Sequence, residues 1–347
     1  MTSMRAIRTL VRVSLLPSSA DTAIVRALRW SIAVGVMILS VGCSGSSIPA
    51  PRPDTPAPPP VDTIRDIPLD AYVAATALSE FAPAAGTPDA VESMYAVQTI
   101  VARTYAAAHR GRHARDGFDL CSTTHCQIYE PSRLVTSRWA ELAQRAARRT
   151  TGFVILYRGL PADAVFHADC GGSTSAASDV WGGAGLPYLP ARADDGAASG
   201  AHAAWQYAVD SDALGRMLEA SPRLRLGGAP TAIRVISRDA SGRVARLRLQ
   251  AAATGGDITI AGTALRDAMS ATFGARTLRS TLFEVVRDGR QFRFSGKGFG
   301  HGVGLCQAGA LARVTAGDDP LAVLAHYYPG TVVGPAPLTR SSHTPPD

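Results

Sequence analysis

The sequence predicts an α+β fold in which helices are mixed with short antiparallel strands. Apolar side chains recur at helical spacing in residues 88–109, whereas from Gly152 onward they alternate with a period of two. Hydrophobic residues make up 46% of the 347 residues and charged residues 18%, which is the balance of a globular protein. We expect one folded domain over residues 63–335.

The N-terminal stretch is typical of an export signal. Arg26 and Arg29 precede an apolar run over residues 32–41, which is shorter than the roughly 20 residues that a membrane span needs. Residues 40–43 resemble a bacterial lipobox, although Ser40 replaces the usual aliphatic residue. We therefore expect residues 1–43 to be a signal peptide or lipoprotein signal with lipid attachment at Cys43. A plain secretory signal or an uncleaved anchor are the alternatives.

Composition indicates the character of the two segments that flank the domain and the kinds of binding partner to expect. Residues 44–62 are rich in Pro, Ser and Ala and predict an extended tether, and residues 336–347 predict a disordered tail. The net charge of +7 favours anionic surroundings such as a membrane surface or a cell-wall polymer. Because no block of basic residues is interleaved with aromatics, nucleic acid is not expected as a partner.

Glu80 lies where the first predicted helix ends. Pro68 begins this helix and Pro83 cannot continue it, so Glu80 falls at the C-terminal end between Leu78 and Phe81. The helix dipole and the apolar neighbours both disfavour a charged carboxylate there and raise its pKa, which suits a general acid. The alternative is an exposed glutamate at a frayed helix end. A second helix is expected from its N-cap Thr87 to about His109.

The later elements follow from periodicity. A hairpin is predicted between residues 153–157 and 164–168, around the turn at residues 159–161. The segment that starts at Trp205 is predicted to open with a helix. Further strands are expected at residues 232–236, 244–249, 257–260, 282–286 and 291–294, and further helices at residues 139–149, near 265–266 and before residue 330.

Two glycine-rich segments stand out as candidate site loops. Residues 296–310 contain six glycines among their fifteen residues and include His301. Glycine permits positive φ and lets another backbone or a sugar ring approach closely. Residues 167–174 repeat the pattern with His167 beside paired glycines. A glycine-rich turn with one surface histidine is the alternative interpretation.

Four cysteines remain besides Cys43, and an even number in an exported chain suggests two disulfides. Cys121, His125 and Cys126, with His113 or His109 nearby, could instead supply zinc ligands. The spacing is not that of a standard zinc finger, and we favour a Cys121–Cys126 bridge. No other cofactor is expected.

Taken together, ordered blocks along residues 63–335 resemble the SpoIID/LytB family, which is named for stage II sporulation protein D and an amidase enhancer. Each block is weak alone, but their order is specific. The blocks are residues 78–80, 98–105, 126–129, 166–174, 180–182 with 187–189, 262–266, 280–283, 300–310 and 326–330. The resemblance implies one SpoIID-like domain of mixed helices and short strands.

The resemblance also implies a lytic transglycosylase that acts on peptidoglycan glycan and prefers strands without stem peptides. Glu80 matches the family's catalytic glutamate, with Asp119 and Asp169 as potential assistants. Cys170 and Cys306 are expected to pair, as in some exported relatives. The substrate-binding residues would be Arg103, Tyr105, Gln127, Tyr129, His167, Gly171, Gly172, Thr174, Trp181, His301, Gly302, Gly304 and Gln307.

Two other functions stay open. The first is a non-catalytic wall-binding module that enhances a cell-wall amidase, and the second is a zinc-dependent hydrolase built on Cys121, His125 and Cys126. The expected partners are peptidoglycan glycan strands, an amidase, and a membrane through a lipid or signal anchor. The expected location is the cell envelope, either membrane-anchored or periplasmic.

Overall fold

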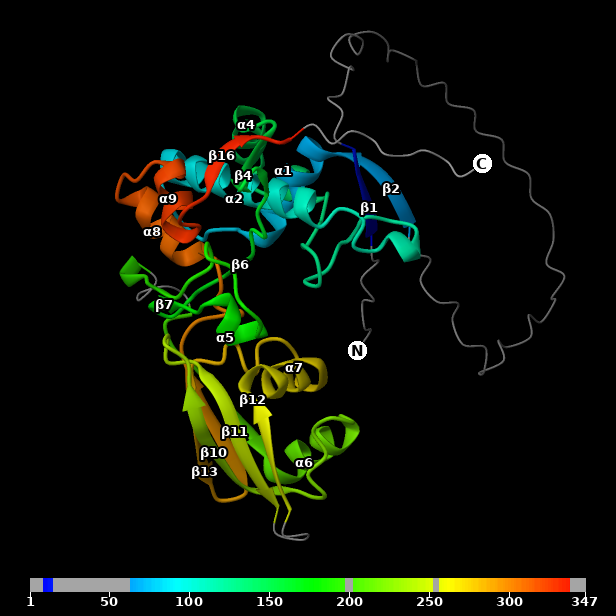
Figure 1. Cartoon of the computed structure of the whole chain (residues 1–347), viewed down its shortest axis with the longest axis vertical. Helices are drawn as coiled ribbons and strands as arrows, with labels where there is room; N and C mark the ends of the chain where they lie inside the picture. The colour runs from blue at the N-terminus through cyan, green and yellow to red at the C-terminus, as the bar shows by residue number, and fades with distance from the viewer. Residues whose placement is uncertain (1–8, 15–62, 197–201, 252–255, 338–347) are drawn as a thin grey trace, which may run out of the picture.

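The chain forms two lobes that follow one another along its long axis (Figure 1). The computed structural model describes residues 9–14, 63–196, 202–251 and 256–337. We call residues 63–196 and 297–337 the helical lobe, and residues 205–296 the sheet lobe. The sheet lobe packs around its own hydrophobic cluster, from Trp205 to Phe294, so the span predicted as one domain contains separate cores.

The helical lobe is organised around α2 (Pro88–Ala108). Its start is the predicted one, because the hydroxyl of Thr87 accepts a hydrogen bond from Ala90 N and Pro88 lies in the first turn. Fourteen of its 21 residues are buried, since helices surround it. These neighbours are α1 (Leu69–Glu80), α4 (Ala140–Arg149), α8 (Gln307–Thr315) and α9 (Pro320–Tyr327).

The strands of the helical lobe correct the predicted hairpin. The strand β4 (Phe153–Tyr157) is present, but it pairs with β5 (Leu160–Pro161) and with β16 (Val332–Pro335). The segment predicted as its partner instead contains β6 (Phe166–His167), which pairs in parallel with β15 (Leu305–Cys306). Only two residues of β5 pair with β4. The chain then turns away from this sheet, and β6 pairs with β15 instead.

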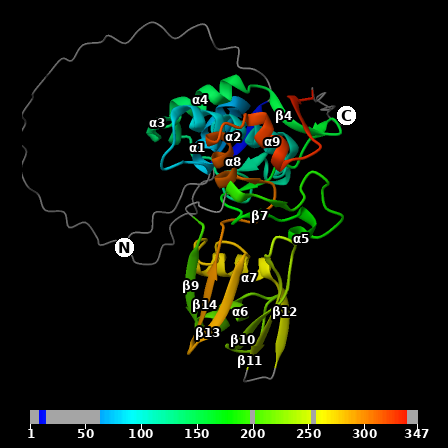
Figure 2. The same ribbon diagram turned by 90° about the vertical axis from the view of Figure 1, so that its left-hand side faces the viewer.

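The sheet lobe contains two three-stranded antiparallel sheets. One has the order β10-β11-β12 and the other the order β13-β14-β9. Both α6 (Ser211–Ala220) and α7 (Gly262–Phe273) lie on the same side of the strands, as Figures 1 and 2 show from two directions. The strands are β9 (Trp205–Asp210), β10 (Pro230–Arg238), β11 (Val244–Ala251), β12 (Asp257–Ala261), β13 (Phe283–Asp288) and β14 (Gln291–Gly296).

The prediction of a helix from Trp205 is wrong for its first six residues, which form β9. Trp205 and Val209 are buried on one face, and the strand pairs with β14 along its whole length. The carboxylate of Asp210 then accepts hydrogen bonds from Asp212 N and Ala213 N and begins α6. The helix was therefore predicted one element too early.

Short elements complete the described chain. Residues Thr9–Ser14, which lie in the stretch assigned to the export signal, form β1 between β2 (Thr63–Pro68) and β3 (Leu120–Cys121).

Cys43, the tether at 44–62 and the last ten residues lie outside the described residues. No helix among the described residues combines the length and hydrophobicity needed to cross a bilayer. The other elements are the 3-10 turn Ala114–Asp116, α3 (Arg133–Thr136), α5 (Ala177–Trp181), β7 (Ser173–Thr174) and β8 (Arg192–Ala193).

Arg103, predicted to line a glycan groove, is instead part of the core. Its side chain is fully buried, and its guanidinium donates to the carbonyls of Thr150 (2.7 Å), Phe153 (3.3 Å) and Ala147 (3.3 Å). It also pairs with Asp70 at 2.9 Å. These contacts tie α2 to the end of α4 and the start of β4, so Arg103 stabilises the helical lobe.

Replacing Arg103 should therefore destabilise the fold. Arg103→Met leaves three carbonyls without their charged donor, and we expect the free energy of unfolding to fall by about 3 kcal/mol. Urea denaturation followed by circular dichroism measures this change. Arg293→Met removes a half-exposed arginine paired with Asp288 and should change stability by less than about 0.5 kcal/mol. Equal effects of the two substitutions would contradict the structural role of Arg103.

Candidate functional site

Glu80 is the last residue of α1, and its carboxyl is held in place by a backbone amide. Leu78 is buried beside it, Phe81 leaves the helix in an extended conformation, and Ile128 N donates to Glu80 Oε1 at 2.5 Å. Burial raises the pKa of Glu80 to about 7, although the hydrogen bond from Ile128 opposes this. A substantial fraction of the side chain is therefore protonated near neutral pH, as a general acid requires.

The end of the long glycine-rich segment contacts the end of α1 directly. The side-chain amide of Gln307 donates to the backbone carbonyl of Glu80 (3.3 Å) and to Gln98 Oε1 (3.2 Å). Gln98 and Gln307 are both buried, so this link is shielded from water. Gln307 thereby fixes the glycine-rich segment against the residue that carries the acid.

The two glycine-rich segments lie against each other. Besides the parallel pairing of β6 with β15, Asp169 and Phe299 exchange backbone hydrogen bonds of 3.1 and 2.8 Å. A Cβ on Gly300 would lie 2.6 Å from the Cβ of His167, so only glycine permits this approach. Both segments were predicted to line one site, and in the structure they are in contact.

Three rings cluster at this contact. The ring of His301 lies 5.4 Å from that of His167 and 5.3 Å from that of Trp181, both in tilted orientations, and Trp181 is 54% exposed. Val303 N donates to His301 Nδ1 at 3.0 Å, so that nitrogen is an acceptor. Burial lowers the pKa of His301 to about 4, and the charges of Arg266 and Arg243 add to the effect. His301 is therefore neutral at physiological pH, and Trp181 offers an open ring face.

Arg243, which no sequence motif indicated, holds both segments from the sheet lobe. Its guanidinium donates to the carbonyls of Cys170 (2.5 Å) and Ser173 (2.8 Å) and is 1% exposed. It also packs on Gly302, where a Cβ would lie 2.5 Å from the guanidinium carbon. An isolated arginine before a strand carries no local signal, so only the fold reveals this role.

Several predicted substrate-binding residues are buried and have internal partners. The amide of Gln127 donates to Ala102 O at 3.1 Å, and the hydroxyl of Thr174 accepts from Arg192 N at 3.0 Å. The ring of Tyr129 stacks on Tyr72, and the hydroxyl of Tyr105 accepts from Arg112. These side chains support the loops around the site.

The predicted glycines and assisting acids differ in their surroundings. Gly172 has open space where a Cβ would point, whereas Gly171 and Gly304 are closely packed. Asp119 accepts from Gly111 N, and Asp169 accepts from Gly171 N. Both aspartates thus bind backbone amides of their own loops, and no described contact joins either one to Glu80.

The predicted disulfides are not formed in the structure, in which Cys121, Cys126, Cys170 and Cys306 are free and buried. Cys170 Sγ donates to a carboxylate oxygen of Asp194 at 3.4 Å, while Cys306 Sγ accepts from Cys170 N at 3.1 Å. Each sulfur of the Cys121 and Cys126 pair instead faces a histidine.

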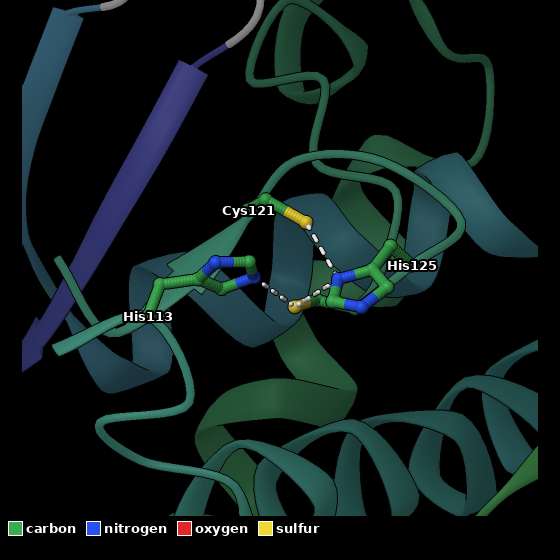
Figure 3. Close-up of side chains that lie close together, drawn as sticks. His113, Cys121 and His125 are labelled. Atoms are coloured by element: carbon green, nitrogen blue, oxygen red, sulfur yellow. Dashed lines mark hydrogen bonds between the residues drawn. The ribbon is translucent and has the colours of Figure 1, made fainter. Parts of the chain in front are cut away.

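Four ligand atoms meet at this second pair. His113 Nε2, Cys121 Sγ, His125 Nδ1 and Cys126 Sγ lie within 4.8 Å of one another, and Figure 3 shows His113, Cys121 and His125 pointing together. The sulfur–nitrogen distances are 3.4, 3.7 and 3.8 Å. A tetrahedron of thiolates and imidazoles around Zn²⁺ has edges of roughly 3.4–3.8 Å. The donor set and its spacing therefore fit zinc.

The surroundings of the cluster also fit a metal. Asp116 Oδ2 lies 3.2 Å from Nδ1 of His113, the nitrogen that does not face the sulfur. A carboxylate in this position orients a metal-binding histidine. Although burial opposes ionisation, hydrogen bonds that include those from Thr123 lower the pKa of Cys121 to about 6, which favours the thiolate that metal binding needs.

Two family models match separate parts of the chain, one in the helical lobe and one over the sheet lobe. Residues 60–157 match the family model SpoIID, described as stage II sporulation protein, and residues 204–304 match DUF8618, a domain of unknown function. The first match contains α1, α2 and the cysteine–histidine cluster, and the second covers the sheet lobe and ends within the glycine-rich segment.

Curated relatives align with most of the chain. An amidase enhancer of Bacillus subtilis is 28% identical over 68% of this chain and 37% of its own length. Stage II sporulation protein D of Bacillus amyloliquefaciens is 26% identical over 79% of this chain and 76% of its own length. An uncharacterised Brachyspira hyodysenteriae protein is 28% identical, with 62% of its length covered. The chain thus spans less than two thirds of the amidase enhancer and of the Brachyspira protein.

The raised pKa of Glu80 has a consequence for stability. The folded state binds this proton more tightly than the unfolded chain, so the stabilisation is fully present below about pH 4.5 and is lost as pH rises through about 7. Glu80→Gln mimics the protonated acid and lacks this loss. We expect the stability of Glu80→Gln relative to wild type to increase between about pH 5 and about pH 8.

Urea denaturation at several pH values measures this difference. Glu141→Gln, at a glutamate whose side chain is 85% exposed, is the matched control and should show no such trend. A flat difference for Glu80→Gln would mean that the pKa of this carboxyl is not raised.

Proposed function

Because the chain belongs to the SpoIID family, we propose that it is a peptidoglycan lytic transglycosylase of the cell envelope. The observation that supports this most directly is a half-buried carboxyl with a pKa near 7, placed beside the contacting glycine-rich segments. Its substrate would be glycan strands of alternating N-acetylmuramic acid and N-acetylglucosamine, with strands that lack stem peptides preferred.

One carboxyl is sufficient for the proposed reaction. Protonated Glu80 gives its proton to the glycosidic oxygen, so the bond from muramyl C1 to that oxygen breaks and the N-acetylglucosamine end leaves as an alcohol. The resulting carboxylate takes the proton from the muramyl C6 hydroxyl while its oxygen bonds to C1. The product is a 1,6-anhydro ring and the acid is regenerated. Hydrolysis would need a second carboxylate for water, and no described contact places one beside Glu80.

The amide of Ile128 contributes to both half-reactions. Its hydrogen bond to Glu80 Oε1 fixes one oxygen, which leaves the other to face the substrate. The same bond stabilises the carboxylate after the proton has been given away. Burial keeps that carboxylate basic enough to accept the C6 proton.

We also propose that His113, Cys121, His125 and Cys126 hold a structural zinc ion. Four protein ligands complete a tetrahedron and leave no position for water, so the ion would not act as a hydrolytic catalyst. Cys126 precedes Ile128 by two residues, so a metal here would fix the loop that carries the amide bound to Glu80.

The amidase enhancer among the relatives favours a second candidate, a wall-binding module that raises the activity of an amidase without cleaving glycan itself. Binding of purified wall without release of soluble fragments, unchanged by Glu80→Gln, would support this candidate.

Digestion of purified glycan without stem peptides tests the enzyme. Wild type should release soluble fragments with 1,6-anhydromuramyl ends, detected by mass spectrometry. Glu80→Gln should lower the rate by at least about 10³-fold, and Glu141→Gln should match wild type. Above about pH 7 the wild-type rate should fall about tenfold per pH unit, because the acid loses its proton. Undiminished release by Glu80→Gln would exclude this mechanism.

Metal analysis of the purified full chain tests the zinc site. We expect about one zinc per chain, and a chelator should lower the melting temperature by several degrees. Cys126→Ser should lose the metal, whereas Cys170→Ser should retain it. Purified protein that binds no zinc under reducing, zinc-supplemented conditions would contradict the proposal.

A further inference from the structure

Arg266 of the sheet lobe lies next to the glycine-rich segment that carries His301. It projects from the second turn of α7, and its Nε donates to the carbonyl of Arg279 at 3.3 Å. The same carbonyl accepts from Gly300 N at 2.9 Å, so Arg266 and the residue before His301 share one acceptor. The guanidinium is thereby fixed next to the glycine-rich segment.

The charge of Arg266 is weakly compensated. Among the described residues its carboxylate contact is Asp267, at 3.6 Å, and that side chain is 73% exposed. The side chain of Arg266 itself is only 21% exposed. Arg243, the other guanidinium near His301, has both terminal nitrogens engaged by Cys170, Ser173 and Ser241. A largely desolvated cation whose terminal nitrogens have one long carboxylate contact is arranged to receive an anion.

Open space lies at Trp181 and at three glycines of the neighbouring loops. The side chain of Trp181 is more than half exposed over His301, and Gly172, Gly182 and Gly183 have no neighbouring atoms where a Cβ would point. A pyranose ring packed on Trp181 would lie next to His301, and His301 follows Gly300, the residue that shares the carbonyl of Arg279 with Arg266.

We propose that Arg266, with Trp181 and His301, forms a subsite for a carboxylate-bearing sugar, in which the guanidinium binds the free lactyl carboxylate of N-acetylmuramic acid. This inference rests on the proposed substrate and assigns the recognition of its charge to the sheet lobe. A guanidinium matches a carboxylate with two parallel hydrogen bonds. A methyl ester or a peptide amide at the same position is neutral and cannot form that ion pair.

Equilibrium binding to the full chain carrying Glu80→Gln tests the subsite without turnover. The two probes are a glycan oligomer without stem peptides and the same oligomer with its carboxylates methyl-esterified. We expect the free acid to bind at least about tenfold more tightly. Adding Arg266→Met should abolish this preference while the ester still binds. Arg266→Lys should retain part of the preference, since it keeps the charge but loses the paired geometry.

Arg293→Met is the matched control and should leave the preference unchanged, and the melting temperature of each variant confirms folding. Equal binding of acid and ester, or a preference that survives Arg266→Met, would overturn the subsite even where wild type cleaves glycan. A preference that depends on Arg266 in a chain that releases no fragments would uphold the subsite and refute the enzyme. Absence of binding to both probes would refute both.

Discussion

The arrangement of the site depends on one buried cation, the guanidinium of Arg243. It comes from the sheet lobe, donates to carbonyls of the first glycine-rich segment, and packs against Gly302 of the second. Asp239 accepts from Arg243 N and from the hydroxyl of Ser175, so the same turn holds the first segment twice. Burying this charge is tolerated because both terminal nitrogens donate hydrogen bonds, although Nε has no partner among the described residues. The sheet lobe is thus a structural part of the site.

The acid is held from two further directions. Gln307 links the end of α1 to the glycine-rich segment, and Ile128 binds the carboxyl from the loop that carries the cysteine–histidine cluster. Three parts of the chain that are distant in sequence therefore converge on one helix end. This explains how a carboxyl at the edge of a helix can be fixed and partly desolvated at once, which is the combination that raises its pKa.

Several parts of the fold and of the candidate site could be predicted from local sequence patterns, and the wrong predictions have physical causes. Glu80 was placed correctly at a helix end because Pro83 stops the helix, and the glycine-rich segments were identified because their composition is unusual. Arg103 was assigned to the glycan groove from the family resemblance, whereas its hydrogen-bond partners lie on another helix and strand. The pairing of β6 with β15 joins residues 139 positions apart, so periodicity could not reveal it. Arg243 belongs to no motif, and the block at 262–266 contains Arg266 without indicating its contact with the other lobe.

The central claim is that Glu80 directs the muramyl C6 hydroxyl, and not water, to the anomeric carbon. Digestion of glycan without stem peptides in water enriched in oxygen-18, followed by mass spectrometry of the products, tests it most directly. The account predicts muramyl ends that are lighter by one water than a reducing sugar and carry none of the heavy isotope. Reducing ends labelled with oxygen-18 would show that water is the nucleophile and would contradict it.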